Sequence, residues 1–168
     1  LQARTPPLRI IAPGKCFRTE TVAATHLACF NQVEVLLVAR NVTLGHLKAT
    51  LVGLVERLLG RRVPTRFRLA FSPFVEPGPD LDLHCSFCVG EGLRVAGGPC
   101  PVCKGKKWIE VIPCGLVHPN VFSACGHDPE AWQGFAFGMG FDRMVMLRYG
   151  IDDLRRMYEG RLDLVRQF

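Results

Sequence analysis

Four cysteines in the middle of the chain form two closely spaced pairs. Their pattern is Cys-x2-Cys, then eleven residues, then Cys-x2-Cys, and it falls within residues 84–107. Each pair allows two thiolates to converge on one ion, and such spacing is typical of four-cysteine zinc sites. A redox pair or simple packing residues are the alternatives. We expect a zinc knuckle with the ligands Cys85, Cys88, Cys100 and Cys103.

A second group of residues has the chemistry to bind a nucleotide. The segment Phe17-Arg18-x-Glu20 is followed by His26-x3-Phe30. An arginine on a strand can hold a phosphate through two hydrogen bonds, an aromatic ring can stack on a base, and a carboxylate can accept from an amino group. An arginine of this kind is also commonly a surface ion-pair partner, and that alternative stays open at this point.

Two further segments carry residues suited to a ligand. Glycines recur between Gly134 and Gly140, just before Arg143. They would let a ligand lie flat against the backbone, although close packing of a strand on a helix is an equal alternative. Residues 71–77 combine aromatic rings and a carboxylate on a stretch stiffened by prolines, where Glu76 could hold Mg²⁺ at a polyphosphate.

Hydrophobic patterning indicates the strands that position these residues. Strands are expected at 8–11, 33–39, 61–71, 107–112 and 135–140, and the cysteine insert would then cap a hairpin. A turn is expected at Pro13-Gly14, and the prolines at 73, 77 and 79 predict a break in regular structure.

Helical patterning completes the expected fold. Leucines spaced by three and four residues predict a helix from Leu44 to Leu58, with Thr43 as its N-cap and Gly60 as its stop. Further helices are expected to begin near Phe141 and at Asp152 or Asp153. The sum is an α+β fold in which helices flank an antiparallel sheet.

The composition is that of an ordinary globular domain. The 168 residues carry 21 Lys and Arg against 15 Asp and Glu, a formal net charge of +6, and 48% of them are hydrophobic. These values argue against a disordered chain, and the length suits one domain over residues 1–168. No apolar run reaches the roughly 20 residues of a membrane-spanning helix, and the first residues lack a secretory signal. We therefore expect a cytoplasmic protein with no membrane partner.

Together these clusters resemble the α subunit of bacterial phenylalanyl-tRNA synthetase, a class II aminoacyl-tRNA synthetase. The resemblance covers almost the whole chain and includes a similar two-cysteine-pair insert before Trp108-Ile109-Glu110. It is carried by residues 7–14, 24–26, 30, 32–34, 73–77, 117–121, 134–140, 147–151 and 166–168. The resemblance implies a class II catalytic core without the N-terminal part of that subunit.

What the resemblance implies is ATP-dependent activation of phenylalanine to phenylalanyl-adenylate, followed by transfer to tRNA(Phe). Arg18 of motif 2 would hold the α-phosphate and Arg143 of motif 3 the γ-phosphate side, as the catalytic residues. Phe30 would stack on adenine. The remaining nucleotide contacts would be Glu20, His26 and Glu76, the last of which could bind Mg²⁺.

The resemblance also implies an amino-acid site and partners. Gln32 and Glu34 would bind the amino group of phenylalanine, and the ring pocket would be formed by Phe74, Val75, Ala136 and Gly138. The implied cofactors are ATP, Mg²⁺ and Zn²⁺, and the implied partners are tRNA(Phe) and a β subunit in an α2β2 assembly. The arginines left for a tRNA or partner surface are Arg155, Arg156, Arg161 and Arg166.

Four positions, Asn31, Val35, Ser72 and Pro113, depart from the family pattern. Ser72 stands where the family usually has Phe, which removes an aromatic ring from the expected pocket and should weaken phenylalanine binding. Two hypotheses follow. The chain is the catalytic domain of such a synthetase subunit, or it is a synthetase-like paralog that acts as an ATP-binding or regulatory module without aminoacylation.

Overall fold

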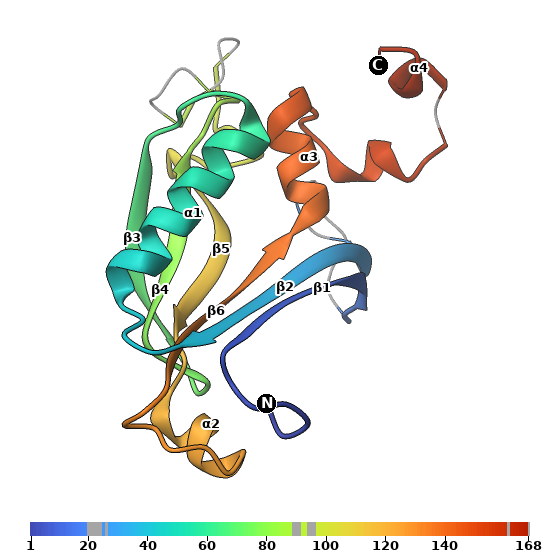
Figure 1. Ribbon diagram of the computed structural model, residues 1–168. Coiled ribbons are helices and arrows are strands. Elements are labelled where there is room, and N and C mark those ends of the chain that lie inside the picture. Colours follow the sequence, from blue (N-terminus) through green and yellow to red (C-terminus); the bar gives the residue numbers. More distant parts are fainter. Residues whose placement is uncertain (20–24, 26, 89–91, 94–96, 161, 168) are drawn as a thin grey trace.

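A computed structural model describes the chain except for residues 20–24, 26, 89–91, 94–96, 161 and 168 (Figure 1). Six strands form one antiparallel sheet in the order β1-β2-β6-β5-β4-β3, which confirms the predicted α+β class. In chain order the elements are β1 (Leu8–Phe17), β2 (Cys29–Ala39), α1 (Leu44–Leu59), β3 (Thr65–Ser72), β4 (Val75–His84), β5 (Trp108–Leu116), α2 (Pro119–Ala124), β6 (Gln133–Gly140), α3 (Phe141–Tyr149), the 3-10 helix η1 (Leu154–Met157) and α4 (Leu162–Val165).

The neighbouring strands β2 and β6 divide their side chains between the two faces of the sheet. The rings of Phe135 and Phe137 and the side chain of Met139 on β6 are buried in the main core. On the same face, α1 and α3 pack against each other and against the sheet (Figure 1). The alternate residues of β2 and β6 therefore lie on the opposite face, where the candidate site is built.

The long helix α1 forms as its pattern predicts. Leu47, Leu51 and Val55 are fully buried, so the leucine stripe is a core face. Thr43 caps the helix by accepting from the backbone N–H of His46, and Gly60 ends it with a φ of 67°. A left-handed residue at this position favours glycine because it has no Cβ.

Two of the predicted interruptions by proline are wrong. Strand β1 continues through Pro13-Gly14, with Pro13 opposite Val33. The strand lies at the edge of the sheet, where a missing N–H is tolerated. Strand β4 likewise continues through Pro77 and Pro79, because its ladder with β5 begins only at Asp80 and the prolines remove no bond from it.

The C-terminal part also differs from the prediction. The helix expected at Asp152 or Asp153 is a short 3-10 helix, capped where Asp153 accepts from the backbone N–H of Arg155 at 3.0 Å. Gly160, at a φ of 67°, separates it from α4. Helix α2 was not predicted, although His118 caps it and Pro119 occupies its first turn, as in many helices.

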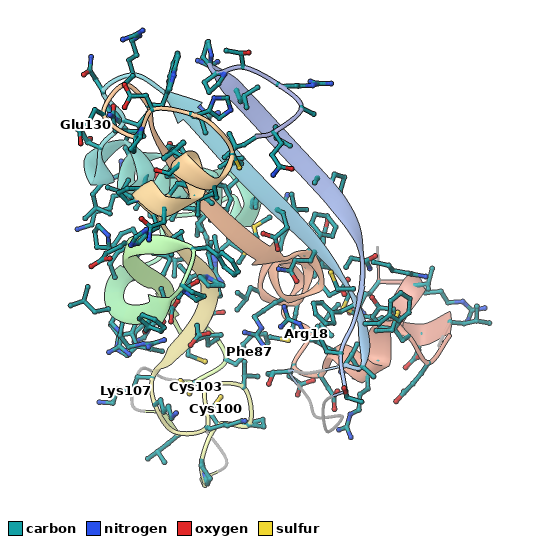
Figure 2. The ribbon with its side chains drawn as sticks, turned by 90° about the horizontal axis from the view of Figure 1, so that it is seen from below. Arg18, Phe87, Cys100, Cys103, Lys107 and Glu130 are labelled. Atoms are coloured by element: carbon teal, nitrogen blue, oxygen red, sulfur yellow. The ribbon has the colours of Figure 1, made fainter. Side chains whose placement is uncertain are left out.

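The cysteine insert joins β4 to β5, which confirms that it caps a hairpin. It lies at the opposite end of the molecule from Glu130, which is in the loop after α2 (Figure 2). Within the described residues, none of the helices is long and apolar enough to cross a membrane.

Candidate functional site

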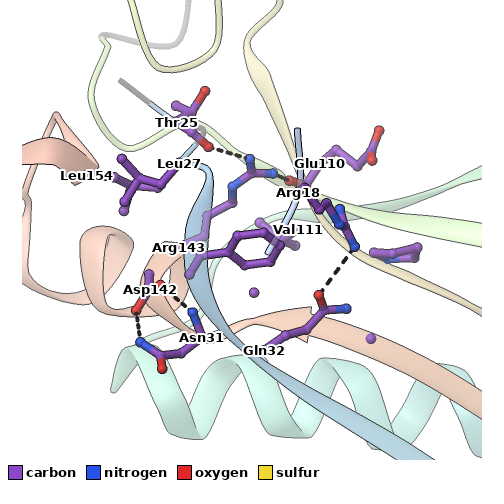
Figure 3. A pocket seen from close by; sticks show the side chains of 14 residues that line it. Arg18, Thr25, Leu27, Asn31, Gln32, Glu110, Val111, Asp142, Arg143 and Leu154 are labelled. Atoms are coloured by element: carbon purple, nitrogen blue, oxygen red, sulfur yellow. Dashed lines mark hydrogen bonds between the residues drawn. The ribbon is translucent and has the colours of Figure 1, made fainter. Parts of the chain in front are cut away.

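Two adjoining cavities lie on the face of the sheet opposite α1 and α3. The first, the arginine cavity, has a volume of about 330 Å³ and is lined by Arg18, Phe30 and Arg143 among others (Figure 3). The second, the glutamate cavity, has a volume of about 540 Å³ and is lined by Glu34, among others. Four residues line both cavities, namely Arg18, Gln32, Pro113 and Gly138.

Arg18 stands between the two cavities. The pairing of β1 with β2 extends to it, because its backbone N–H donates to the carbonyl of Ala28 at 2.9 Å. Its guanidinium carbon lies 5.0 Å from the centre of the Phe30 ring, and its Nη2 donates to Gln32 Oε1 at 3.4 Å. The predicted phosphate-binding arginine and the predicted base-stacking ring therefore form one unit.

Arg143 approaches the arginine cavity from the first turn of α3. Its Nη1 donates to the backbone carbonyl of Glu110 at 2.7 Å, and its Nη2 donates to the carbonyl of Thr25 at 2.9 Å (Figure 3). These bonds join α3 to β5 and to the end of the β1–β2 connection. They orient the guanidinium in the cavity wall, so two arginines and one aromatic ring line the same space, which suits an anionic ligand with a flat ring.

A buried carboxylate next to Arg143 joins three elements and was not predicted. Asp142 is 5% exposed and accepts from the backbone N–H of Asn31 at 2.7 Å and from its Nδ2 at 3.0 Å. The hydroxyl of Tyr158 donates to Asp142 Oδ2 at 2.8 Å and accepts from Asn31 Nδ2 at 3.0 Å. Partial burial, together with the Asp142 carboxylate, raises the pKa of Tyr158 to about 12.

The glutamate cavity brings together all of the residues predicted to bind an amino acid. Gln32, Glu34, Phe74, Val75, Ala136 and Gly138 line it. Gln32 Nε2 donates to Glu34 Oε1. Burial raises the pKa of Glu34 above its usual 4.5, although the hydrogen bond from Gln32 and the charge of Arg18 act in the opposite direction. An incoming ammonium group would replace the solvation that this carboxylate lacks.

Gly138 leaves space for the polar side chains of this cavity. A Cβ atom at this position would lie 2.7 Å from Glu34 Oε1 and 2.8 Å from Gln32 Nε2. By contrast, a Cβ at Gly134 would meet the backbone carbonyl of Leu37 at 2.5 Å, which is a packing constraint. The packing interpretation of the glycine segment therefore holds at Gly134, whereas Gly138 makes room for the side chains of Glu34 and Gln32, and the ligand interpretation stays a prediction.

The aromatic wall of the glutamate cavity is open. Phe74 is 68% exposed and Phe71 is 93% exposed, while Ser72 contributes no ring. Cys114, at the floor, donates its S–H to the carbonyl of Pro79 at 2.9 Å. Burial raises the pKa of Cys114 to about 12, so this thiol stays neutral.

Among the described residues predicted to bind the nucleotide or the amino acid, Glu76 is not brought into these cavities. Its Oε2 lies 3.2 Å from Nε2 of His118. Glu20 and His26 lie outside the described residues.

Thr25, Glu110 and Asp142 were not predicted as site residues, and their contacts leave little trace in the sequence. Thr25 and Glu110 hold Arg143 through backbone carbonyls, which carry no side-chain signature. The sequence contains one signal by which Asp142 could have been found, because it is an acidic residue in an otherwise apolar and glycine-rich segment.

The four predicted zinc ligands lie together in the insert. Their sulfur atoms are all within 4.8 Å of one another, and the Cys85–Cys100 and Cys88–Cys103 Sγ pairs are each 3.9 Å apart. Tetrahedral zinc with Zn–S bonds of about 2.3 Å separates its sulfur ligands by about 3.8 Å. The cluster therefore has the dimensions of a tetrahedral metal site. Cys100 and Cys103 are labelled in Figure 2.

The protonation of these thiols differs within the cluster. Burial raises the pKa of Cys85 and of Cys103. Burial also opposes ionisation of Cys100, but hydrogen bonds from the backbone of Cys103 and Val102 lower the pKa of Cys100. A bound cation would favour the thiolate form throughout the cluster.

Known proteins resemble this chain along its whole length. Phenylalanine--tRNA ligase alpha subunits of Leptospira biflexa and Clostridium beijerinckii are 48% and 46% identical to it over 168 residues. These alignments cover 100% of this chain and 47% and 48% of the respective relatives. The chain thus spans about half the length of the curated relatives it matches.

A solved structure and a family model agree on the fold. A pyrrolysyl tRNA synthetase of Desulfitobacterium hafniense, PylSc, superposes with a TM-score of 0.55 at 18% identity, over 92% of this chain and 46% of that one. At this identity the likeness shows the fold alone. The model described as tRNA synthetases class II core domain (F) matches residues 1–168. The chain therefore belongs to the class II tRNA synthetase core domain family.

Proposed function

We propose that this chain forms the catalytic core of a phenylalanine--tRNA ligase alpha subunit, which activates phenylalanine with ATP and transfers it to tRNA(Phe). The observation that carries the proposal is the meeting of the two cavities at Arg18 and Gln32. A nucleotide in one cavity and an amino acid in the other would bring the α-phosphate and the carboxylate together at Arg18.

The arginine cavity is the proposed ATP site. Phe30 would stack on adenine, Arg18 would bind the α-phosphate, and Arg143 would bind the γ-phosphate side. The carboxylate of phenylalanine would attack the α-phosphorus, and pyrophosphate would leave. This reaction needs positioning and charge stabilisation, which two fixed guanidinium groups supply, and it needs no protein nucleophile.

The glutamate cavity is the proposed phenylalanine site. Glu34 and Gln32 would accept the ammonium group, and Phe74, Val75 and Ala136 would contact the ring. The small side chain of Ala136 leaves room for a phenyl group, and each methylene in such a pocket is worth roughly 1–3 kcal/mol of discrimination.

Metal ions supply additional charge in the proposal. Class II synthetases use ATP with Mg²⁺, and Mg²⁺ would neutralise the phosphates when bound. Glu76 is the proposed Mg²⁺ ligand, and it would have to leave His118 to reach the phosphates. Zn²⁺ in the four-cysteine cluster would have a structural role, since four thiolates would leave no open coordination position.

Partners and location belong to the same proposal. The relatives are named alpha subunits, which supports a β subunit as partner in an α2β2 assembly, with tRNA(Phe) as the second substrate. We place the protein in the cytoplasm, where tRNA is charged.

Phenylalanine-dependent ATP–pyrophosphate exchange tests the proposal, with the purified chain alone and with a β subunit. We expect exchange that Arg18→Ala and Arg143→Ala each abolish. Arg9→Ala is the matched control, because Arg9 is an exposed arginine of β1 that lines neither cavity. Absence of exchange in both preparations would contradict the proposal.

A second candidate is a synthetase-like ATP-binding module without aminoacylation. The open aromatic wall of the glutamate cavity favours it, since Ser72 adds no ring and Phe74 is 68% exposed. The same assay separates the two candidates, because a module of this kind would bind ATP in calorimetry and show no phenylalanine-dependent exchange.

A further inference from the structure

A third cavity lies beneath the cysteine insert. It has a volume of about 490 Å³ and is lined by Arg66, Arg68, Lys104, Lys106 and Arg143, together with the carboxylates of Asp82 and Glu110 and with Trp108. We call it the insert cavity. It shares Thr25, Glu110 and Arg143 with the arginine cavity, so the two lie side by side.

A buried carboxylate positions two of these cations. Asp82 is 2% exposed, and its Oδ2 accepts from Arg66 Nε at 2.9 Å and lies 3.4 Å from Arg68 Nε. Arg66 also lies over the ring of Trp108, with 4.6 Å from its guanidinium carbon to the ring centre. Within the described residues the terminal nitrogens of Arg66 have no hydrogen-bond partner, so they remain able to donate to a ligand.

The two lysines come from the insert itself. Lys104 directly follows Cys103, the last cysteine of the cluster, and Lys106 lies two residues further on; neither lysine forms an ion pair with any residue the structure describes. Five cations therefore line the insert cavity against two carboxylates, and Asp80, which pairs with Arg68 at 2.8 Å, adds a third carboxylate beside it. A cavity with this excess of positive charge favours a ligand that carries phosphate groups.

One of the residues that line the cavity also has an unsatisfied acceptor. Oδ1 of Asp82 is buried and has no hydrogen-bond partner among the described residues. A buried acceptor without a partner is costly, and a ligand hydroxyl that reached this atom would satisfy it. A ribose hydroxyl is such a donor, whereas fully ionised pyrophosphate is not.

We propose that the insert cavity binds phosphate groups, and that Asp82 favours those of a single-stranded RNA over free pyrophosphate. The guanidinium plane of Arg66 and the free lysines offer the stacking and the positive charge that single strands use. The RNA part of this proposal deepens the proposed function and rests on it, since the strand would be the end of the tRNA that must reach the aminoacyl-adenylate.

Fluorescence anisotropy of a labelled single-stranded RNA ending in CCA tests the proposal on the purified chain. Lys104→Gln/Lys106→Gln should weaken binding by tenfold or more and reduce the slope of log affinity against log salt by about 0.7 for each lysine. Arg9→Gln/Lys48→Gln is the matched control, because it removes the same charge from exposed residues outside the three cavities and should leave binding unchanged.

A further variant, a DNA analogue and a pyrophosphate competitor show whether the cavity binds the phosphates of RNA or phosphate groups in general. Arg66→Gln tests the opposite wall without touching the insert, and it should weaken RNA binding as well. The DNA analogue should bind more weakly than the RNA, and unlabelled pyrophosphate should compete poorly. If pyrophosphate competes strongly and the DNA binds equally, the phosphate site stands and the preference for RNA is overturned. If both variants bind RNA and pyrophosphate like the unchanged chain, the proposal is overturned.

Calorimetry with ATP distinguishes a failure of the insert-cavity proposal from a failure of the proposed function. The lysine variant should bind ATP like the unchanged chain, because neither lysine lines the arginine cavity. A chain that binds RNA through the insert cavity but does not bind ATP would contradict the ATP site and leave the insert cavity in place.

Discussion

A Cβ atom at Gly138 would lie 2.7 Å from Oε1 of Glu34, so the glycine on β6 and the carboxylate on β2 share one space. Gly138 and Glu34 are direct partners in the ladder between these strands. The side chain of Glu34 can lie over β6 only because position 138 has none.

We therefore expect Gly138→Ala to displace Glu34 and Gln32 and to weaken phenylalanine binding about 10-fold to 100-fold, with ATP binding retained. Equilibrium binding of each ligand measures this. Gly14→Ala is the control, since a Cβ at Gly14 meets nothing within 4 Å. Equal loss of phenylalanine and ATP binding would show that the glycine supports the fold rather than this cavity.

Phenylalanine binding should depend on the ionisation of Glu34. Burial raises the pKa of Glu34 above 4.5, so its carboxylate takes up a proton at a higher pH than an exposed glutamate does. The ammonium group binds the ionised form, and affinity should therefore fall as pH decreases through this raised pKa. Titration calorimetry at several pH values measures the effect. Glu34→Gln should bind weakly with a flat pH profile, and a profile unchanged by this substitution would contradict the assignment.

Tyr158 should contribute to stability through Asp142 and Asn31. Removing its hydroxyl in Tyr158→Phe is expected to cost about 1 kcal/mol in the free energy of unfolding at neutral pH, which urea denaturation measures. Tyr149→Phe is the control, since Tyr149 is the other tyrosine of the chain and takes no part in the Asp142 network.

The raised pKa of the Tyr158 hydroxyl predicts how the free energy of unfolding changes at alkaline pH. The pKa of Tyr158 is raised from 10.0 to about 12, so above pH 10 the unfolded chain loses this proton before the folded chain does. The stabilising contribution of the protonated hydroxyl is complete below pH 10 and is lost as pH rises toward 12. The stability difference between the unchanged chain and Tyr158→Phe should therefore shrink over this interval. A difference that grows there would contradict the sign.

Metal removal should act on the insert first. We expect about one zinc per chain by elemental analysis, lost on treatment with a chelator together with a fall in Tm. A loss of only about 1 kcal/mol in the free energy of unfolding would lower the Tm by roughly 2–4 °C for a chain of this size. Cys100→Ser should lose the zinc, whereas Cys16→Ser should retain it, because Cys16 lies on β1 outside the cluster. A metal-free protein with an unchanged Tm would refute the zinc site.

The sequence by itself determined the local elements and the chemistry that they carry. Thr43, the leucine stripe and Gly60 are enough to define α1, because a helix is specified by residues that are neighbours along the chain. The two cysteine pairs likewise predicted a cluster, since each pair needs only one tight turn. The alternation along β6 predicted a strand that leads into a helix at Phe141.

Only the tertiary structure decided where prolines are tolerated and which residues meet. Pro13, Pro77 and Pro79 lie within strands because of the position of their ladders in the sheet, which a local pattern does not contain. The carbonyls that orient Arg143 and the Asp142 network join residues more than 100 positions apart or act through the backbone. The order of the six strands brings these groups together, and it also places the cations of β3 and of the insert around one cavity.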